Sequence, residues 1–163
     1  MNRPSTTKLL SDLLERYIDP HNDPRIYWAK EVTFDYASPD AVRVDYMRFE
    51  PINNSVSGIE KGNIYCYEVK SSVADFHSKN GHNLIGDYNY YVMLEETYES
   101  VKRLVPYNVG VMCPTSDDIS CDSNELRVVK KANRKDRQKP LAEMLLMMWR
   151  SSRREIVKNR RKK

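Results

Sequence analysis

The chain changes its pattern near residue 70, and this change limits the folds open to it more than any other feature. Before that point, three segments rich in β-branched and aromatic residues follow one another, at 31–36, 41–49 and 63–69. After it, strand-like segments at 87–94 and 108–113 alternate with helix-like segments. Consecutive strands usually pair antiparallel, whereas strands that alternate with helices pair parallel. We therefore expect an α/β fold with a mixed sheet of five to six strands flanked by helices.

Helical spacing of apolar residues predicts helices at both ends of the chain. Leucines recur at helical intervals across 6–18, and Asp19-Pro20 would end that helix. Pro140 suits the first turn of a long final helix. The residues expected to pack from that helix share one face: Leu141, Met144, Leu145, Met148, Trp149, Ser152 and Ile156. Further expectations are a short helix opened by Ser72 and ended by Gly81, a helix at 95–104, an edge strand at 126–129, and irregular connections at 19–28 and 51–62.

Length and composition suit one domain with its own core. The chain has 163 residues, of which 40% are hydrophobic and 31% charged. We expect residues 1–139 to form the domain, and 140–163 to form a basic helix and tail packed on it or appended to it. No run approaches the roughly 18–20 apolar residues of a membrane span, and no secretory leader pattern is present, so a cytoplasmic location is expected. Cys66, Cys113 and Cys121 lack CxxC spacing, which indicates reduced thiols rather than disulfides or structural zinc.

The positive charge is concentrated near the C-terminus. The net charge is +4, but residues 150–163 hold eight basic residues and one acid, so they carry +7 and residues 1–149 carry −3. A second basic stretch, KKANRKDRQK, covers 130–139. Such segments either contact phosphates in a salt-dependent manner or remain a solvated face. The candidates for phosphate contacts are Lys79, Lys130, Lys131, Arg134, Lys135, Arg150, Arg153 and Arg154.

Three charged residues lie within predicted strands, where burial is costly unless charges are paired or bind a metal. Asp45 lies in the second strand, and Glu68 and Lys70 end the third. Glu68 and Lys70 are two residues apart and leave the same face. If the two strands pair antiparallel, the two acids converge. With the backbone carbonyl of Val69 they offer an oxygen-only site that suits Mg²⁺ or Mn²⁺, and Lys70 would hold or deprotonate a bound water. The alternative is a salt bridge on a solvent-facing strand.

The order of these residues resembles the PD-(D/E)xK nuclease superfamily, which has the restriction-endonuclease-like fold. The matching segments read RVDYMRF and IYCYEVKSS, with Val44 where the family has proline. The stretch VKSSVADFHSKNGHNLIGDYNYYVM is similar to the branch of MmcB-like DNA repair proteins and related phage proteins. Their pattern is ExKSSxxDF, a helix, and then an acidic residue leading an aromatic-rich strand. The resemblance covers roughly residues 31–114.

The resemblance implies a Mg²⁺- or Mn²⁺-dependent endo- or exonuclease acting on DNA in repair, recombination or phage DNA metabolism, encoded by a bacterium or a phage. Asp45 and Glu68 would be its metal ligands and Lys70 its catalytic lysine. Glu31, or Glu15 in the first helix, would be a secondary acid that reaches the metal through water. Another hypothesis is a catalytically silent restriction-like module that binds nucleic acid or a partner. RNA as substrate also stays open, and the Met- and Leu-rich final helix could supply a homodimer face.

Overall fold

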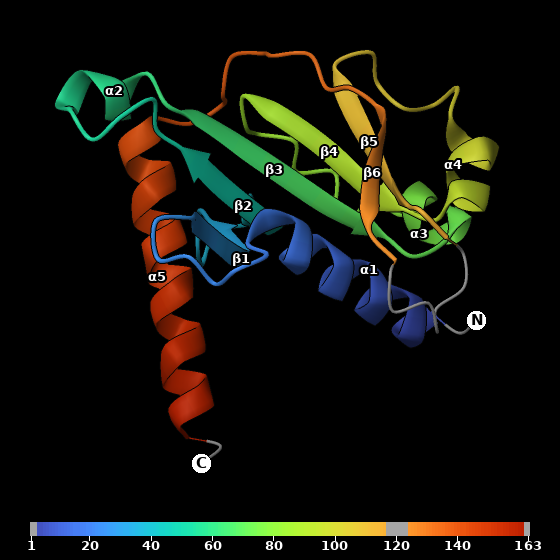
Figure 1. Ribbon diagram of the computed structural model, residues 1–163, viewed down its shortest axis with the longest axis horizontal. Helices are drawn as coiled ribbons and strands as arrows, with labels where there is room; N and C mark the ends of the chain where they lie inside the picture. Colours follow the sequence, from blue (N-terminus) through green and yellow to red (C-terminus); the bar gives the residue numbers. More distant parts are fainter. Residues whose placement is uncertain (1–2, 117–123, 162–163) are drawn as a thin grey trace.

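The computed structural model describes residues 3–116 and 124–161, which build one six-stranded mixed sheet with helices on both faces (Figure 1). The strand order follows the chain order, from β1 to β6. β1, β2 and β3 pair antiparallel, β3, β4 and β5 pair parallel, and β6 is an antiparallel edge strand on β5. The elements are α1 (Arg3–Ile18), β1 (Tyr27–Phe34), β2 (Val42–Glu50), α2 (Val56–Glu60), β3 (Asn63–Lys70), α3 (Val73–His77), β4 (Tyr88–Met93), α4 (Glu95–Val101), β5 (Val109–Pro114), β6 (Leu126–Lys130) and α5 (Leu141–Arg160). The expected fold class is confirmed.

α1 begins three residues earlier and α4 ends three residues earlier than expected, and three other differences are larger. β1 begins at Tyr27, because 27–30, expected in part as loop, pair with 46–49 of β2. The connection 51–62 contains the short helix α2, whose N-cap Ser55 accepts a hydrogen bond of 3.0 Å from the Gly58 amide. α3 ends at His77 rather than at Gly81. Each error falls where a short element depends on tertiary pairing or on a local cap rather than on a hydrophobic period.

The core lies on both faces of the sheet. On one face, Met144 and Met148 of α5 pack against strand residues that include Phe34, Met47 and Cys66. On the opposite face, the leucines of α1 pack against a cluster that includes Tyr67, Val92 and Met112. A third cluster joins α3 and α4 to β4 and β5. Cys66 and Cys113 are buried and form no disulfide within the described residues, and Cys121 lies outside them.

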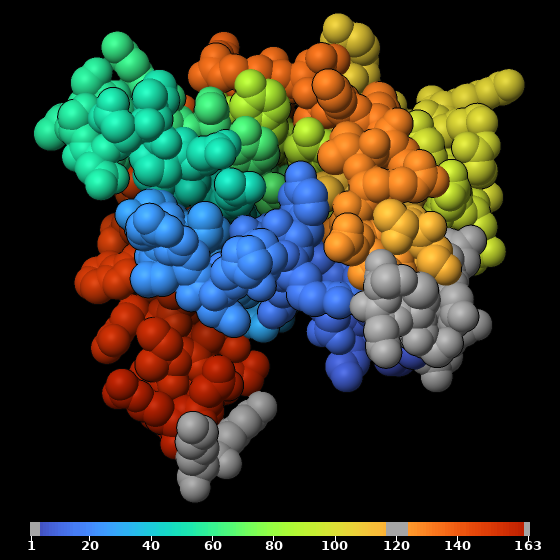
Figure 2. Space-filling view, in the orientation of Figure 1, coloured from blue at the N-terminus to red at the C-terminus, as the bar shows by residue number. Residues whose placement is uncertain are grey.

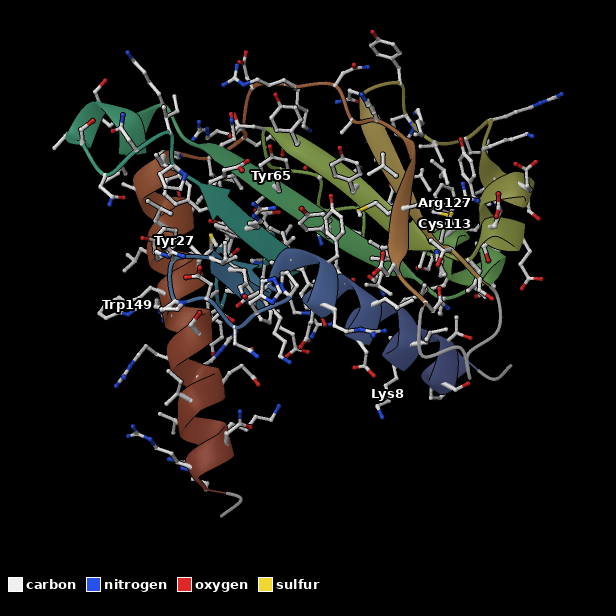
Figure 3. All side chains as sticks on the ribbon, in the orientation of Figure 1. Lys8, Tyr27, Tyr65, Cys113, Arg127 and Trp149 are labelled. Carbon is white, nitrogen blue, oxygen red and sulfur yellow. The ribbon has the colours of Figure 1, made fainter. Side chains whose placement is uncertain are left out.

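The packing face of α5 is shorter than the sequence pattern predicts. Met144 and Met148 are buried, whereas Trp149 and Ile156 are 65% and 42% exposed. The reason is geometric: the first half of α5 crosses β1, and the second half extends past the sheet (Figure 1). Figure 3 shows Trp149 projecting from the outer side of α5 near Tyr27. Among the described residues, no helix combines the length and apolar character needed to cross a membrane.

Candidate metal and nucleic-acid site

β2 and β3 separate at Asp45. Their pairing runs from Glu50 opposite Asn63 to Tyr46 opposite Tyr67. At the next position, Oδ2 of Asp45 accepts a hydrogen bond of 2.9 Å from the backbone amide of Val69. Where the two strands separate, the side-chain carboxylate of Asp45 thus accepts the hydrogen bond of a β3 amide. This bond fixes Asp45 beside the C-terminal end of β3.

The backbone of β1 is strained opposite this point. Glu31 has φ of 52°, in the left-handed region that is costly for residues other than glycine. Its register places it across from Asp45, between the pairs Lys30–Tyr46 and Val32–Val44. Two groups of α5 contact this bend: Ser151 donates to the Lys30 carbonyl, and Arg154 donates to the Glu31 carbonyl at 2.8 Å. α5 therefore helps to hold the bend that faces Asp45.

Glu68 and Lys70 are both buried at the end of β3. Nζ of Lys70 donates to the carbonyl of Asn80 at 2.7 Å. A Cβ on Gly81 would lie 2.9 Å from that Nζ and 3.0 Å from Oε2 of Glu68, so the two side chains end beside the same glycine. Gly81 has φ of 69°. It does not end α3; it closes the backbone over Glu68 and Lys70 at a distance that a side chain would obstruct.

Both carboxylate oxygens of Glu68 are buried, and neither makes a well-formed hydrogen bond with the described residues, although the Asn83 amide and the Asp45 carboxyl lie close enough to influence its pKa. Burial raises the pKa of Glu68 to about 8, the negative charge of Asp45 adds to this rise, and the ammonium of Lys70 opposes it. Burial also raises the pKa of Asp45, against the hydrogen bond from Val69. Lys70 acts on both acids, and Asp45 also lies near the positive charge of Arg43 and the negative charge of Asp75.

A cleft of about 1040 Å³ opens beside these residues. Figure 2 shows the surface hollowed between α1 and the C-terminal half of α5. The lining of this central cleft is mostly polar and charged; it includes Ser11, Lys30, Glu31, Arg43, Asp45, Lys70, Asp75, Lys79, Gly81, Glu155 and Lys158. The cleft therefore gives a charged ligand a route to Asp45 and Lys70, while Glu68 lies buried behind them.

The residues present fit a divalent cation with oxygen ligands. The two buried oxygens of Glu68, which lack a well-formed hydrogen bond from the described part of the chain, are the clearest sign, because such atoms normally bind a proton donor or a cation. Asp45 and the Val69 carbonyl are the other oxygen donors that the sequence suggested. Within 3–116 and 124–161, no group of three or more His, Cys, Asp or Glu side chains is placed to hold a metal. Mg²⁺ commonly uses only one or two carboxylates and keeps several waters, so two acids remain compatible with it.

The secondary acids lie at different depths. Glu31 is exposed on the rim of the central cleft, with its carboxylate 4.0 Å from Nη1 of Arg43. Glu15 accepts a hydrogen bond from the Tyr46 hydroxyl at 2.8 Å and pairs with Lys30 at 3.2 Å. Asp75, the acid of the ExKSSxxDF pattern, also lines the cleft, and its negative charge contributes to the raised pKa of Asp45. Its position shortly after the ExK segment is the sequence feature that could have indicated its place in the site.

The basic candidates divide into two groups. In the 130–139 stretch, Arg134 pairs with buried Asp87 at 3.3 Å, and Lys135 donates to the Leu84 carbonyl. Lys130 donates to the Pro106 carbonyl at 2.6 Å, while Lys131 is exposed. By contrast, Lys79 lines the central cleft, and Arg150, Arg153 and Arg154 are exposed on the second half of α5.

Comparison with known proteins supports the fold but gives no information on the chemistry of the site. No family model and no curated protein matches the chain. The solved structure of the SPO1766 protein of unknown function from Silicibacter pomeroyi is similar to it, with a TM-score of 0.60 and 18% identity. The match covers 96% of this chain and 91% of that one. At this identity the likeness shows a shared fold alone.

Proposed function

We propose that the chain is a metal-dependent nuclease that hydrolyses DNA phosphodiester bonds with Mg²⁺ or Mn²⁺. The observation that carries this proposal is the carboxylate of Glu68, which is buried beside Asp45 and Lys70 with no well-formed hydrogen bond from the described residues to either of its oxygens. A buried, unsatisfied acid costs stability. Such a cost is expected where the acid performs chemistry, and the open cleft beside it gives a substrate access.

The residues have distinct roles in the proposed reaction. Asp45, Glu68 and the Val69 carbonyl would hold the cation, which when bound would polarise the phosphate and lower the pKa of a coordinated water. Nζ of Lys70 donates to the carbonyl of Asn80, which holds the ammonium group at the end of β3, where it would orient the attacking water. Hydrolysis joins the water oxygen to phosphorus, breaks one P–O bond, and transfers a proton from the water to the leaving oxygen. Lys30, Lys79 and Lys158 in the cleft would attract the substrate's phosphates.

The test is nicking of supercoiled plasmid DNA with Mg²⁺, with Mn²⁺ and with EDTA. We expect metal-dependent nicking by the natural chain and its loss in Glu68→Ala and Glu68→Gln, each shown to be folded by circular dichroism. The matched control is Glu96→Gln, which changes an exposed acid of α4. Normal turnover by folded Glu68→Gln protein contradicts the proposal. DNA binding that is unaffected by metal, with no nicking, supports a silent binding module instead.

A further inference from the structure

We infer that the substrate enters as a single strand along a groove on the second half of α5. The inference rests on the proposed nuclease function only for the position of the scissile phosphate, in the central cleft. A second groove of about 1050 Å³, here called the α5 groove, follows that half of the helix. It shares Glu31, Thr33, Glu155 and Lys158 with the central cleft. The two hollows are therefore continuous, and a chain leaving the central cleft meets α5 next.

One face of α5 supplies a row of cations to this groove. Arg150, Arg154, Lys158 and Arg161 are spaced by four, four and three residues, so they project from the same side of the helix. The row spans about 16 Å at 1.5 Å per residue. Glu155 is the acid of this segment, 3.8 Å from Lys158. The excess of positive charge is complementary to a polyanion that runs along the helix axis.

Two exposed aromatic rings line the same groove. Tyr36 is 75% exposed and Trp149 is 65% exposed. Neither ring is packed in the core, and each presents a flat aromatic face to solvent beside the row of cations. Bases of a single strand can stack on such rings, whereas the bases of a duplex are stacked on one another. The combination of cations and free rings distinguishes a single-strand path from a surface for double-stranded DNA.

In the other basic stretch, 130–139, several cations are paired with acids of the domain. Arg134, Arg137 and Lys139 form ion pairs with acids of the body, at 3.3, 3.2 and 2.9 Å. By contrast, Arg153 of α5 makes no ion pair or hydrogen bond with the residues that the structure describes. In the α5 row, Arg154 donates to the Glu31 carbonyl and Lys158 lies 3.8 Å from Glu155, so one acid faces the several cations of this segment.

The test measures binding of the full chain, in EDTA, by fluorescence anisotropy. The probes are a labelled single-stranded DNA of about 20 nucleotides, longer than the groove, and the same strand in a duplex. We expect the single strand to bind at least about tenfold more tightly than the duplex. Tyr36→Ala and Trp149→Ala should each weaken single-strand binding by about fivefold or more. The matched control is Tyr107→Ala, which removes an 83% exposed ring that lines neither groove.

The salt dependence provides a second readout. In Arg150→Gln/Lys158→Gln protein, the slope of log K against log salt should fall in magnitude by about 1.4, or about 0.7 for each lost phosphate contact. Lys61→Gln/Arg103→Gln removes the same charge from exposed sites outside both grooves and should leave the slope unchanged. Equal affinity for duplex and single strand, or aromatic variants that bind like Tyr107→Ala, would overturn the inference.

The two proposals can fail separately. Binding in EDTA does not depend on cleavage, so groove-dependent binding without metal-dependent cleavage of either the single strand or the plasmid refutes the nuclease proposal alone. Metal-dependent nicking, with single-strand binding that ignores the α5 variants, refutes the single-strand path alone.

Discussion

At the scale of single residues, the candidate site is a small group of charges held close together at a cost. Glu68 is buried without a well-formed hydrogen bond among the described residues, and Asp45 lies near enough to raise its pKa further. The sequence could identify Asp45, Glu68 and Lys70, because charges inside strand-like segments stand out. It could not identify Asn80 and Gly81 as their neighbours, because that contact depends on how the chain returns after α3.

The raised pKa of Glu68 predicts a pH-dependent stability. Between the ordinary glutamate pKa of 4.5 and the folded-state pKa of about 8, the folded protein binds more protons than the unfolded chain. The free energy of unfolding therefore falls as pH rises through this window. Glu68→Gln removes the titration, so this variant should gain stability relative to the natural chain between pH 5 and pH 8, by on the order of a few kcal/mol. Urea unfolding in EDTA at pH 5 and at pH 8 measures this gain. A difference in unfolding free energy between variant and natural chain that is the same at both pH values would contradict the prediction.

Gly81 should tolerate no side chain. Gly81→Ala adds a Cβ where Lys70 and Glu68 approach to about 3 Å, and it forces an alanine into a left-handed conformation. We expect a loss of roughly 1–2 kcal/mol in unfolding free energy and a loss of metal-dependent nicking.

Gly81→Asn separates these two effects, because asparagine accepts the left-handed backbone more readily but still carries a Cβ. It should regain part of the stability and none of the nicking. Full nicking by Gly81→Asn would show that the close approach has no role in the reaction.

At the scale of elements, the sequence predicts well what depends on a hydrophobic period and less well what depends on pairing. α1, β2, β3 and β5 begin and end within a few residues of their expected bounds. The sequence did not predict the first four residues of β1, because 27–30 form a strand only through pairing with β2. It also did not predict α2, because this helix is a single turn that depends on its N-cap. The buried face of α5 was overextended, since the sequence does not show where the sheet beneath it ends.

Residues 131–139 connect β6 to α5 and are fastened to β4 by Asp87. This acid is buried, pairs with Arg134 and Arg137, and accepts a hydrogen bond of 2.8 Å from the Ile64 amide. Removing one partner of a buried pair leaves the others uncompensated. Asp87→Asn should therefore lower the unfolding free energy by about 2–4 kcal/mol, measured by urea or thermal unfolding.

The matched change is Asp35→Asn, which breaks an ion pair of 2.9 Å between half-exposed Asp35 and Lys139. It should cost no more than about 1 kcal/mol. Similar losses in the two variants would show that the Asp87 pairs are not what fastens this segment.

At the scale of the whole molecule, α1, the sheet and α5 meet around one cleft, so a cation bound there should stabilise the folded chain against heat. Mn²⁺ at about one hundred times its Kd should add about 2.7 kcal/mol, which corresponds to a rise in Tm of several degrees for a chain of this size. Asp45→Asn should abolish the rise, while Asp12→Asn, at an exposed acid of α1, should keep it. A rise that survives Asp45→Asn would place the cation elsewhere.

The strand order of the sheet also has a consequence for synthesis of the chain. Because neighbours in sequence are neighbours in the sheet, each strand can pair with its predecessor soon after it leaves the ribosome. α5 is the exception: it is made after all six strands and returns to the first of them. Until then, the apolar side of β1 and β2, with Phe34 and Met47, has no cover from α5. The nascent polypeptide is therefore most exposed to aggregation just before its final helix is translated, and that is the stage at which a chaperone would protect it.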